Sequence, residues 1–262
     1  MLVTTELDPR AIEVERRDGS AASSLRTRVA LPPGTAGQHS VKLARSVHSG
    51  RIARALRESI IDGALAAGTP LVENQLAVEL AVSRGPVRSA LHVLQSEGLV
   101  ETLPNGRMVT VRFGPDDLRD LLAVRHELES SAVRRGAALR ADIAPIRAAF
   151  DAIRHEGAST GHLVELDVEF HRSLVEFGGS RFLTSAWLAL APVIQAVISI
   201  GNRRLATEDP VSNYHRILTA HERLLDPLSR YDADAVIEVL AAQFSITQAQ
   251  FRSSESSELD GA

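Results

Sequence analysis

Residues 82–100 read VSRGPVRSALHVLQSEGLV, and this stretch decides the fold of the N-terminal half of the chain. Ser83 is a residue type favoured at helix N-caps, and Pro86 falls in the first turn, where its missing N–H breaks no helical hydrogen bond. Apolar residues then recur at helical spacing as far as Leu94. The pattern predicts an amphipathic helix that ends near Gly98.

Two helices are predicted before this one, and a β-hairpin after it. Residues 47–62 carry apolar side chains along one helical face, and a turn leads to a short helix over about residues 73–81. Strand-like residues 99–103 and 107–111 flank a Pro-Asn-Gly turn, and Asn-Gly is a strong hairpin signal. The predicted order is three helices and a two-stranded wing.

Three arginines fall at the start of the predicted third helix and at the tip of the wing, which are the parts of a winged helix-turn-helix that contact DNA. Arg84 and Arg88 lie one turn apart on the face opposite the apolar stripe, at the end of the helix that enters a major groove. Arginine pairs bidentately with guanine, which makes it the commonest specific contact. Asn105, Gly106 and Arg107 form the wing tip and are placed to reach an adjacent groove or backbone. The alternative is that these side chains are only solvated surface.

Residues 51–111 resemble the winged helix-turn-helix of GntR-type transcriptional regulators. The resemblance rests above all on the Ser-Arg-x-Pro-Val-Arg sequence at residues 83–88. It implies a DNA-binding domain over residues 41–112. The family's DNA contacts then fall on Ser83, Arg84, Pro86, Arg88 and Gly106. One position departs from the pattern, because Asn74 stands where a DNA-contacting Arg is frequent.

The chain after Phe113 has no strand-like alternation. Helical periodicity predicts six segments, at about residues 116–139, 142–155, 160–177, 181–205, 211–229 and 232–251. We therefore expect a mostly α protein, in which an all-α bundle of six to seven helices over residues 113–252 follows the winged domain. Residues 1–40 and 253–262 show no sustained period, which predicts a disordered N-terminal arm and a flexible tail.

Five polar residues sit where the bundle's helical period predicts burial. They are Arg125, Asp167, His171, His221 and Gln243. Since an unpaired buried charge is costly, these groups should pair with one another, with a metal or with an anion. Asp167 and His171 have the i, i+4 spacing of a helix-borne metal pair, and His221 supplies a third ligand from another helix. The alternative is a buried Asp–His hydrogen bond with His221 satisfied separately.

Arg125 is the predicted contact for an anionic effector. A guanidinium on an otherwise apolar helix face is suited to bidentate capture of a carboxylate. The alternative is a structural ion pair with Asp167 or Glu129.

Residues 113–250 resemble, more weakly, the C-terminal ligand-binding bundle of FadR-type regulators, the FCD domain. Asp167-Val168-Glu169-Phe170-His171 carries its Asp-x-x-Phe-His signature. The resemblance implies a Zn- or Ni-like ion at Asp167, His171 and His221, with an organic-acid effector bound against it. Gln243 stands where a third His is expected. Either three residues hold the ion and leave positions open for an effector carboxylate, or the affinity is too low for occupancy.

Composition limits the class of protein. The chain has 262 residues, a net charge of −4 and no cysteine, which excludes disulfides and thiolate chemistry. Residues 40–112 hold nine basic and six acidic residues, whereas residues 113–262 hold fifteen and twenty-two. No signal pattern is present, so we expect a soluble, cytoplasmic protein. Residues 182–202 carry no charge, and we interpret them as a buried core helix rather than a membrane span.

These observations predict a homodimeric transcriptional regulator, most simply a repressor, and not an enzyme. Its partners would be a palindromic double-stranded DNA operator and a small carboxylate effector, with no membrane. One alternative is a metal-dependent hydrolase built on Asp167, His171 and His221. Another is a DNA-binding dimer that has no effector.

Overall fold

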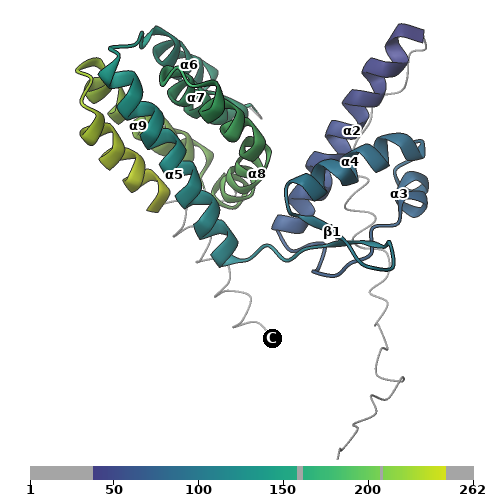
Figure 1. Cartoon of the computed structure of the whole chain (residues 1–262). Helices are drawn as coiled ribbons and strands as arrows, with labels where there is room; N and C mark the ends of the chain where they lie inside the picture. The colour runs from purple at the N-terminus through teal and green to yellow at the C-terminus, as the bar shows by residue number, and fades with distance from the viewer. Residues whose placement is uncertain (1–37, 158–161, 207–208, 246–262) are drawn as a thin grey trace, which may run out of the picture.

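The computed structural model describes residues 38–157, 162–206 and 209–245 and has the predicted, mostly helical fold (Figure 1). Its first half contains α2 (Gln38–Ile61), α3 (Glu73–Glu79), α4 (Arg84–Ser96), β1 (Val100–Thr102) and β2 (Met108–Thr110). Its second half contains α5 (Pro115–Ala138), α6 (Ala144–Glu156), α7 (Leu163–Phe177), α8 (Arg181–Ala206), α9 (Pro210–Ser229) and a last helix over residues 233–245. The predicted arm and tail lie outside the described residues, except that residues 38–40 begin α2.

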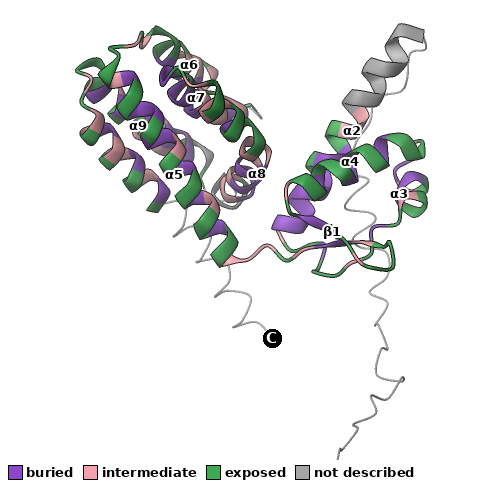
Figure 2. Cartoon of the chain, in the orientation of Figure 1, coloured by how far each residue is buried: buried purple, intermediate pink, exposed green. Residues whose placement is uncertain are grey.

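The first half is a winged helix-turn-helix. The apolar stripe of α4, which includes Val87, Leu91 and Leu94, is fully buried and packs against α2 (Figure 2). Ser83 is the N-cap residue, as predicted, although its side chain makes no capping hydrogen bond. Helix α2 begins at Gln38, well before the predicted start at residue 47. The prediction missed residues 38–46 because they have no apolar stripe from which a helix could be inferred.

A buried ion pair fastens the two long helices of this half. Arg57 on α2 donates from Nε and Nη2 to the two carboxylate oxygens of Glu97, at 2.7 and 2.6 Å. Glu97 is the C-cap residue of α4. Both side chains are buried. The bidentate pair ties the C-terminal end of α4 to α2.

The wing is the predicted antiparallel hairpin. Val100 pairs with Thr110, and Thr102 pairs with Met108. At the tip, the Asn105 Oδ1 atom accepts a hydrogen bond from the Arg107 amide at 3.0 Å. Gly106 has φ +79°, a conformation that glycine adopts without steric cost.

The second half is a helical bundle with α7 at its centre. Helix α7 packs against α5, α6 and α8. Two glycines allow close approach of α5 and α7. A Cβ atom at Gly136 would lie 2.1 Å from the Phe177 ring, and one at Gly178 would lie 2.7 Å from the Cα atom of Ala132. The crossing is therefore too tight for any side chain at either position.

Helix α8 is buried on one side only. Residues 181–203 are long and apolar enough to cross a membrane by length and composition alone, but 39% of the most apolar window is buried inside the molecule. Trp187 and Ile194 point inward and are fully buried, whereas Leu188 remains 48% exposed. The predicted core helix is thus a bundle helix with a second, open apolar face.

The two halves touch through α2 and α8, which lie side by side. Arg203 on α8 donates from Nη1 to Glu58 on α2 at 2.7 Å and to Ser199 at 3.2 Å. Arg54 on α2 forms an ion pair of 2.9 Å with Glu165, which belongs to α7. The contact between the halves thus combines these ion pairs with buried apolar residues of α2 and α8, which belong to one hydrophobic cluster.

Candidate DNA-reading surface and effector pocket

Arg84 and Arg88 project from the N-terminal end of α4. Their side chains are 61% and 55% exposed, because the opposite face of the helix is buried in the domain core. They do not lie free in solvent. Both face Glu73, the first residue of α3, which is the helix before α4 in the chain.

Glu73 holds the two arginines together. Arg88 donates to both carboxylate oxygens through Nε and Nη2, with distances of 2.9 to 3.1 Å. Arg84 approaches the same carboxylate to 3.7 Å. The hydrogen bonds from Arg88 lower the pKa of Glu73, so the carboxylate is ionised at neutral pH. Each guanidinium still has N–H groups directed away from Glu73.

The wing tip and Arg84 border a common groove of about 640 Å³. It is lined by Arg84 from α4, by Asn74 and its neighbours at the start of α3, and by Gly106 and Arg107 from the wing. Ser83 and Asn105 are also exposed. Pro86 differs from the other predicted DNA contacts, because its side chain is buried in the first turn of α4. Its place is therefore in the packing of the helix start rather than on the exposed face.

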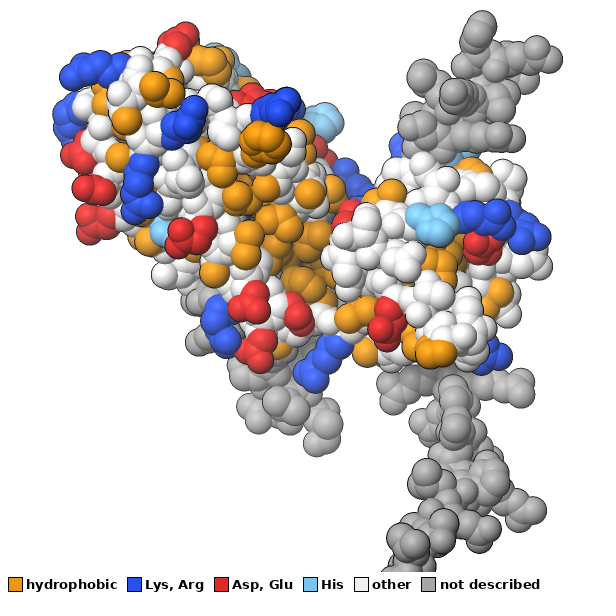
Figure 3. Space-filling model, in the orientation of Figure 1, with side chains coloured by type: hydrophobic (Ala, Val, Ile, Leu, Met, Phe, Trp, Pro, Cys, Tyr) orange, Lys and Arg blue, Asp and Glu red, His pale blue; other side chains and the backbone are white. Residues whose placement is uncertain are grey.

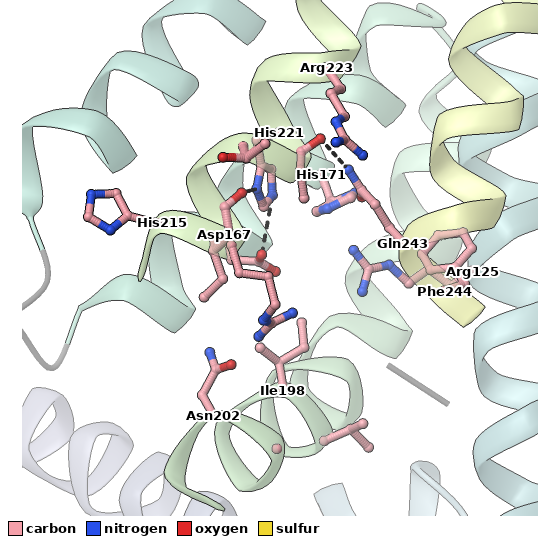
Figure 4. Close-up of a pocket in the computed structure, with 16 residues that line it drawn as sticks. Arg125, Asp167, His171, Ile198, Asn202, His215, His221, Arg223, Gln243 and Phe244 are labelled. Atoms are coloured by element: carbon pink, nitrogen blue, oxygen red, sulfur yellow. Dashed lines mark hydrogen bonds and ion pairs between the residues drawn. The ribbon is translucent and has the colours of Figure 1, made fainter. Parts of the chain in front are cut away.

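A second cavity, of about 370 Å³, lies inside the bundle (Figure 4). Helices α5, α7, α8, α9 and the last helix each contribute to its wall. All five polar residues predicted to be buried together line it, namely Arg125, Asp167, His171, His221 and Gln243. In Figure 4 Asp167, His171 and His221 gather at the centre of the cavity, whereas His215 lies apart.

Three of these residues offer ligand atoms to one point. One nitrogen of His171, one nitrogen of His221 and one oxygen of Asp167 all lie within 4.8 Å of one another. The Nε2 atom of His221 is 3.2 Å from the Oδ1 atom of Asp167. The three residues are buried. The i, i+4 spacing on α7 thus places carboxylate and imidazole together, and α9 brings the third group.

Hydrogen bonds at the other ring nitrogens place one proton on Nδ1 of each imidazole. The Nδ1 atom of His221 lies 2.7 Å from the Ile217 carbonyl, which only accepts, so Nδ1 carries a proton. The Nδ1 atom of His171 lies 2.9 Å from the Glu129 carboxylate and is protonated for the same reason. A neutral imidazole held in this way directs the Nε2 lone pair at the centre of the cavity, as metal-binding histidines do.

The lone pairs give a test of whether a cation fits. Either His221 carries a second proton and forms an ion pair with Asp167, or its lone pair faces the carboxylate across 3.2 Å. A divalent ion among the three residues would remove the repulsion between the His221 lone pair and the Asp167 carboxylate in the second arrangement. Two nitrogens and one carboxylate oxygen form a donor set that suits Zn²⁺ and similar ions and leaves coordination positions open. The residues therefore fit the ion.

The electrostatics of the cavity agree with the ligand forms of these groups. Burial, reinforced by the charge of Arg125, lowers the pKa of His171, so its imidazole is neutral at pH 7. Burial works against the charged form of Asp167, but interactions with His221, His171 and Arg125 outweigh it and hold the pKa of Asp167 below its ordinary value. Asp167 is consequently an ionised carboxylate.

Arg125 has a protein partner. Its Nε donates to the Oε1 atom of Glu129 at 2.9 Å, and the other oxygen of Glu129 faces His171. The Arg125 guanidinium also lies over the rings of Phe244, at 4.9 Å, and Trp187, at 5.6 Å. Arg125 therefore forms the ion pair with Glu129 that was the alternative prediction. It also lines the cavity.

Gln243 stands at the edge of the ligand set. Its Nε2 donates to the Ala220 carbonyl at 2.7 Å, which ties the last helix to α9 one residue before His221. Gln243 lines the cavity in the position predicted for a third His.

Sequence reasoning missed several groups of the cavity wall. Arg216 and Asn202 line it from α9 and α8. Neither belongs to the apolar stripe of its helix, and polar residues beside a stripe usually face solvent. No sequence signal distinguishes Arg216 and Asn202 from solvent-facing polar residues.

Two family descriptions match this chain. "Bacterial regulatory proteins, gntR family" matches residues 48–109, and "FCD domain" matches residues 120–245. Together they span more than half of the chain. The protein belongs to the GntR family of regulators, with an FCD domain as its second half. It is a DNA-binding transcriptional regulator and not an enzyme, which excludes the hydrolase alternative.

The chain is similar to curated regulators over most of its length. It is 29% identical to the gluconate operon transcriptional repressor of Bacillus licheniformis, across 79% of this chain and 86% of that protein. It is 27% identical to the HTH-type transcriptional repressor RspR of Escherichia coli, across 71% and 81%. A solved structure of E. coli McbR/YncC shares the fold, with a TM-score of 0.56, 19% identity, and coverage of 78% and 98%.

Proposed function

We propose that the protein is a cytoplasmic, homodimeric repressor that binds a palindromic operator and releases it when a small organic acid binds in the FCD cavity beside a divalent metal ion. The observation that carries the proposal is the set of Asp167, His171 and His221 around one point of a 370 Å³ cavity. Both histidines are anchored through Nδ1, and the arrangement lies in the domain that the family uses for effectors.

The metal ion would be held by Asp167, His171 and His221. When bound, it supplies a positive charge and open coordination positions for carboxylate and hydroxyl oxygens. Glu129 orients His171, and the Ile217 carbonyl orients His221. Arg125 and Gln243 complete the wall against which an effector lies. The gluconate operon repressor of B. licheniformis is named for an operon that concerns a hydroxy acid, which supports this class of effector.

DNA contact is assigned to the exposed residues of α4 and the wing. Arg84 and Arg88 would read base edges in the major groove, with Ser83 at the backbone. The wing tip, Asn105 to Arg107, would reach the neighbouring groove. Pro86 is not included, because its side chain is buried.

The open face of α5 and α8 is the proposed dimer contact. Val124 on α5 is 48% exposed, and Leu188 and Phe182 on α8 are 48% and 72% exposed. Figure 3 shows hydrophobic side chains gathered on the face that these helices present. A second copy of the chain is the occupant that matches a palindromic operator, because a two-fold protein matches a two-fold site.

The first experiment selects binding sites from a pool of random-sequence DNA with the full-length, zinc-loaded protein. We expect an inverted repeat to be enriched. Fluorescence anisotropy then measures the operator Kd with and without gluconate as the test acid. Arg84→Ala combined with Arg88→Ala should weaken operator binding by at least about tenfold, since each bidentate base contact contributes about 1–3 kcal/mol. Arg172→Ala combined with Arg230→Ala removes the same charge from the bundle surface and should leave the Kd unchanged.

The outcomes separate the parts of the proposal. Equal operator affinity in the Arg84/Arg88 variant and the wild type would contradict the assignment of α4. One zinc ion per chain that is lost in Asp167→Ala supports the metal site. Absence of zinc, together with an operator Kd that no organic acid changes, would leave a DNA-binding dimer without an effector.

A further inference from the structure

Arg216 is a cation of the cavity wall that lacks a matching anion. It lies on α9, half-buried, and it lines the same cavity as the metal-binding residues. Its Nη2 donates to the Asn213 Oδ1 atom at 2.6 Å, and among the described residues no carboxylate lies within ion-pair distance of it. Burial lowers the pKa of Arg216, and only the charge of Asp167 opposes that effect. An anion at this place would be favoured by both charge and geometry.

Arg125 does not have this property. Its charge is matched by Glu129, which is fully buried and accepts from Arg125 at 2.9 Å. Arg125 is therefore compensated, whereas two guanidiniums on α9, the half-buried Arg216 and the exposed Arg223, line the cavity without an ion pair among the described residues. The guanidiniums that remain open to an anion therefore lie on α9, and contact of Arg125 with the effector stays a prediction.

A second unsatisfied group comes from the opposite wall. Asn202 on α8 lines the cavity, and its Nδ2 atom is buried without an acceptor among the described residues. Figure 4 places Asn202 below the metal-binding residues, on the side of the cavity away from Arg125 and Gln243. A buried amide donor without a partner is costly. An acceptor oxygen in the cavity would satisfy it.

The charges of the wall indicate how many anionic groups fit. The pair of Arg125 with Glu129 is neutral, and in the count of charges Asp167 offsets one of the two cations that α9 contributes, Arg216 and Arg223. A divalent ion among Asp167, His171 and His221 adds two positive charges that no described group of the wall compensates. A dianion would compensate more of this positive charge inside the bundle than a monocarboxylate would.

We infer that the effector has two acidic groups, one directed to the metal ion and the other to Arg216 and Asn202. The class is a short-chain dicarboxylate, including hydroxylated diacids, and the size of the cavity sets the limit to small molecules. This inference rests on the proposed metal-dependent function and narrows it. It makes Arg216 the residue that distinguishes a diacid from a monoacid of equal length.

Matched acids test the inference. Gluconate and glucarate have the same six-carbon hydroxylated chain and differ in whether the far end is an alcohol or a carboxylate, and lactate and malate provide a shorter pair. Calorimetry on the full-length, zinc-loaded protein measures the Kd of each acid. We expect at least one diacid to bind tenfold or more tightly than its monoacid partner. In Arg216→Gln this preference should fall to about threefold or less, while zinc stays at one ion per chain.

Arg230→Gln is the control variant. Arg230 lies at the end of the same helix, outside the cavity, and pairs with Asp226 at 2.7 Å. The variant removes the same charge and should keep the diacid preference. Equal affinity for monoacids and diacids, an unchanged preference in Arg216→Gln, or no binding of any diacid would each overturn the inference. Metal-dependent binding of monoacids alone would overturn it and leave the proposed function standing, whereas failure to bind zinc would remove both.

Discussion

Glu129 is shared by two groups of the effector cavity. Its two oxygens face Arg125 and the Nδ1 atom of His171, each at 2.9 Å, and the residue is fully buried. A carboxylate behind a metal-binding histidine fixes the ring orientation and raises its basicity as a ligand. Glu129 thus orients Arg125 and His171, although it does not lie at the centre of the cavity.

The first prediction is that Glu129→Gln weakens zinc binding by roughly 10- to 100-fold while Asp167, His171 and His221 are all retained. Competition with a chromophoric chelator measures the zinc Kd. Glu127→Gln, on the exposed side of the same helix, should bind zinc like the wild type. Zinc binding of Glu129→Gln at the wild-type affinity would sink the role given to this carboxylate.

Glu73 acts at the other end of the molecule. It neutralises Arg84 and Arg88 on the surface assigned to DNA. The second prediction is that Glu73→Gln binds random-sequence DNA a few-fold more tightly and discriminates less between operator and random DNA. The reason is that a negative charge is removed and the guanidiniums lose their fixed orientation. Anisotropy with both DNAs measures the ratio, and Glu79→Gln is the control at the far end of α3. A ratio equal to that of the wild type would contradict the prediction.

Helical period predicted which polar residues meet in the cavity. A charged residue within an apolar stripe must be accommodated inside, so Asp167, His171 and His221 could be named before the fold was known. Arg216 and Asn202 could not be named, because each stands beside a stripe. Which flank of a helix borders a cavity depends on how neighbouring helices are arranged, and one helix's period does not contain that information.

At the scale of elements, the glycines at the crossing of α5 and α7 decide how closely these helices pack. The third prediction is that Gly178→Ala destabilises the protein by roughly 1–3 kcal/mol, because the new methyl group meets the main chain of Ala132 at 2.7 Å. Urea unfolding followed by circular dichroism measures the change. Gly201→Ala lies in the helical interior of α8 with nothing within 4 Å of the new Cβ, and it should leave the stability unchanged or raise it. The same loss of stability in both variants would contradict the packing argument.

The sequence pattern predicted the boundaries of some helices better than those of others. The predicted segments at 116–139 and 181–205 nearly coincide with α5 and α8, since long helical periods extend through both and a capping box marks the start of α5. The start of α2 was missed because residues 38–46 have no stripe. The tight crossing at Gly136 and Gly178 was also beyond prediction, since a glycine in a sequence does not reveal which backbone approaches it.

At the scale of the whole molecule, α8 touches both the effector cavity and the winged domain. This helix lines the cavity at Asn202 and pairs with α2 at Arg203. The fourth prediction is that Arg203→Glu reduces the factor by which a bound acid changes the operator Kd by at least about threefold, while zinc binding persists. The exchange of charges in Arg203→Glu with Glu58→Arg should restore the factor. Failure of the double variant to recover any of it would argue against this contact as the link.

The exposed apolar face of α5 and α8 gives the fifth prediction. Leu188→Glu places a charge on the proposed contact between two copies and should shift the protein toward monomers, with weaker operator binding, while the thermal unfolding of each chain is retained. Analytical ultracentrifugation measures the association state across a range of concentrations. Leu139→Glu introduces the same charge at an exposed leucine just after α5 and serves as the control. A dimer that persists in Leu188→Glu would place the contact elsewhere.

The ionic contact between α2 and the bundle also affects how salt titrations of this protein should be interpreted. Ion pairs as exposed as that of Arg54 with Glu165 weaken as salt screens them. Added salt is therefore expected to weaken the ion pairs between the winged domain and the bundle at the same time as it weakens the attraction between arginine and phosphate. The slope of log Kd against log salt concentration will contain both processes. Counterion release from DNA can be counted only after the slope of a variant without the interdomain pairs has been compared with that of the wild type.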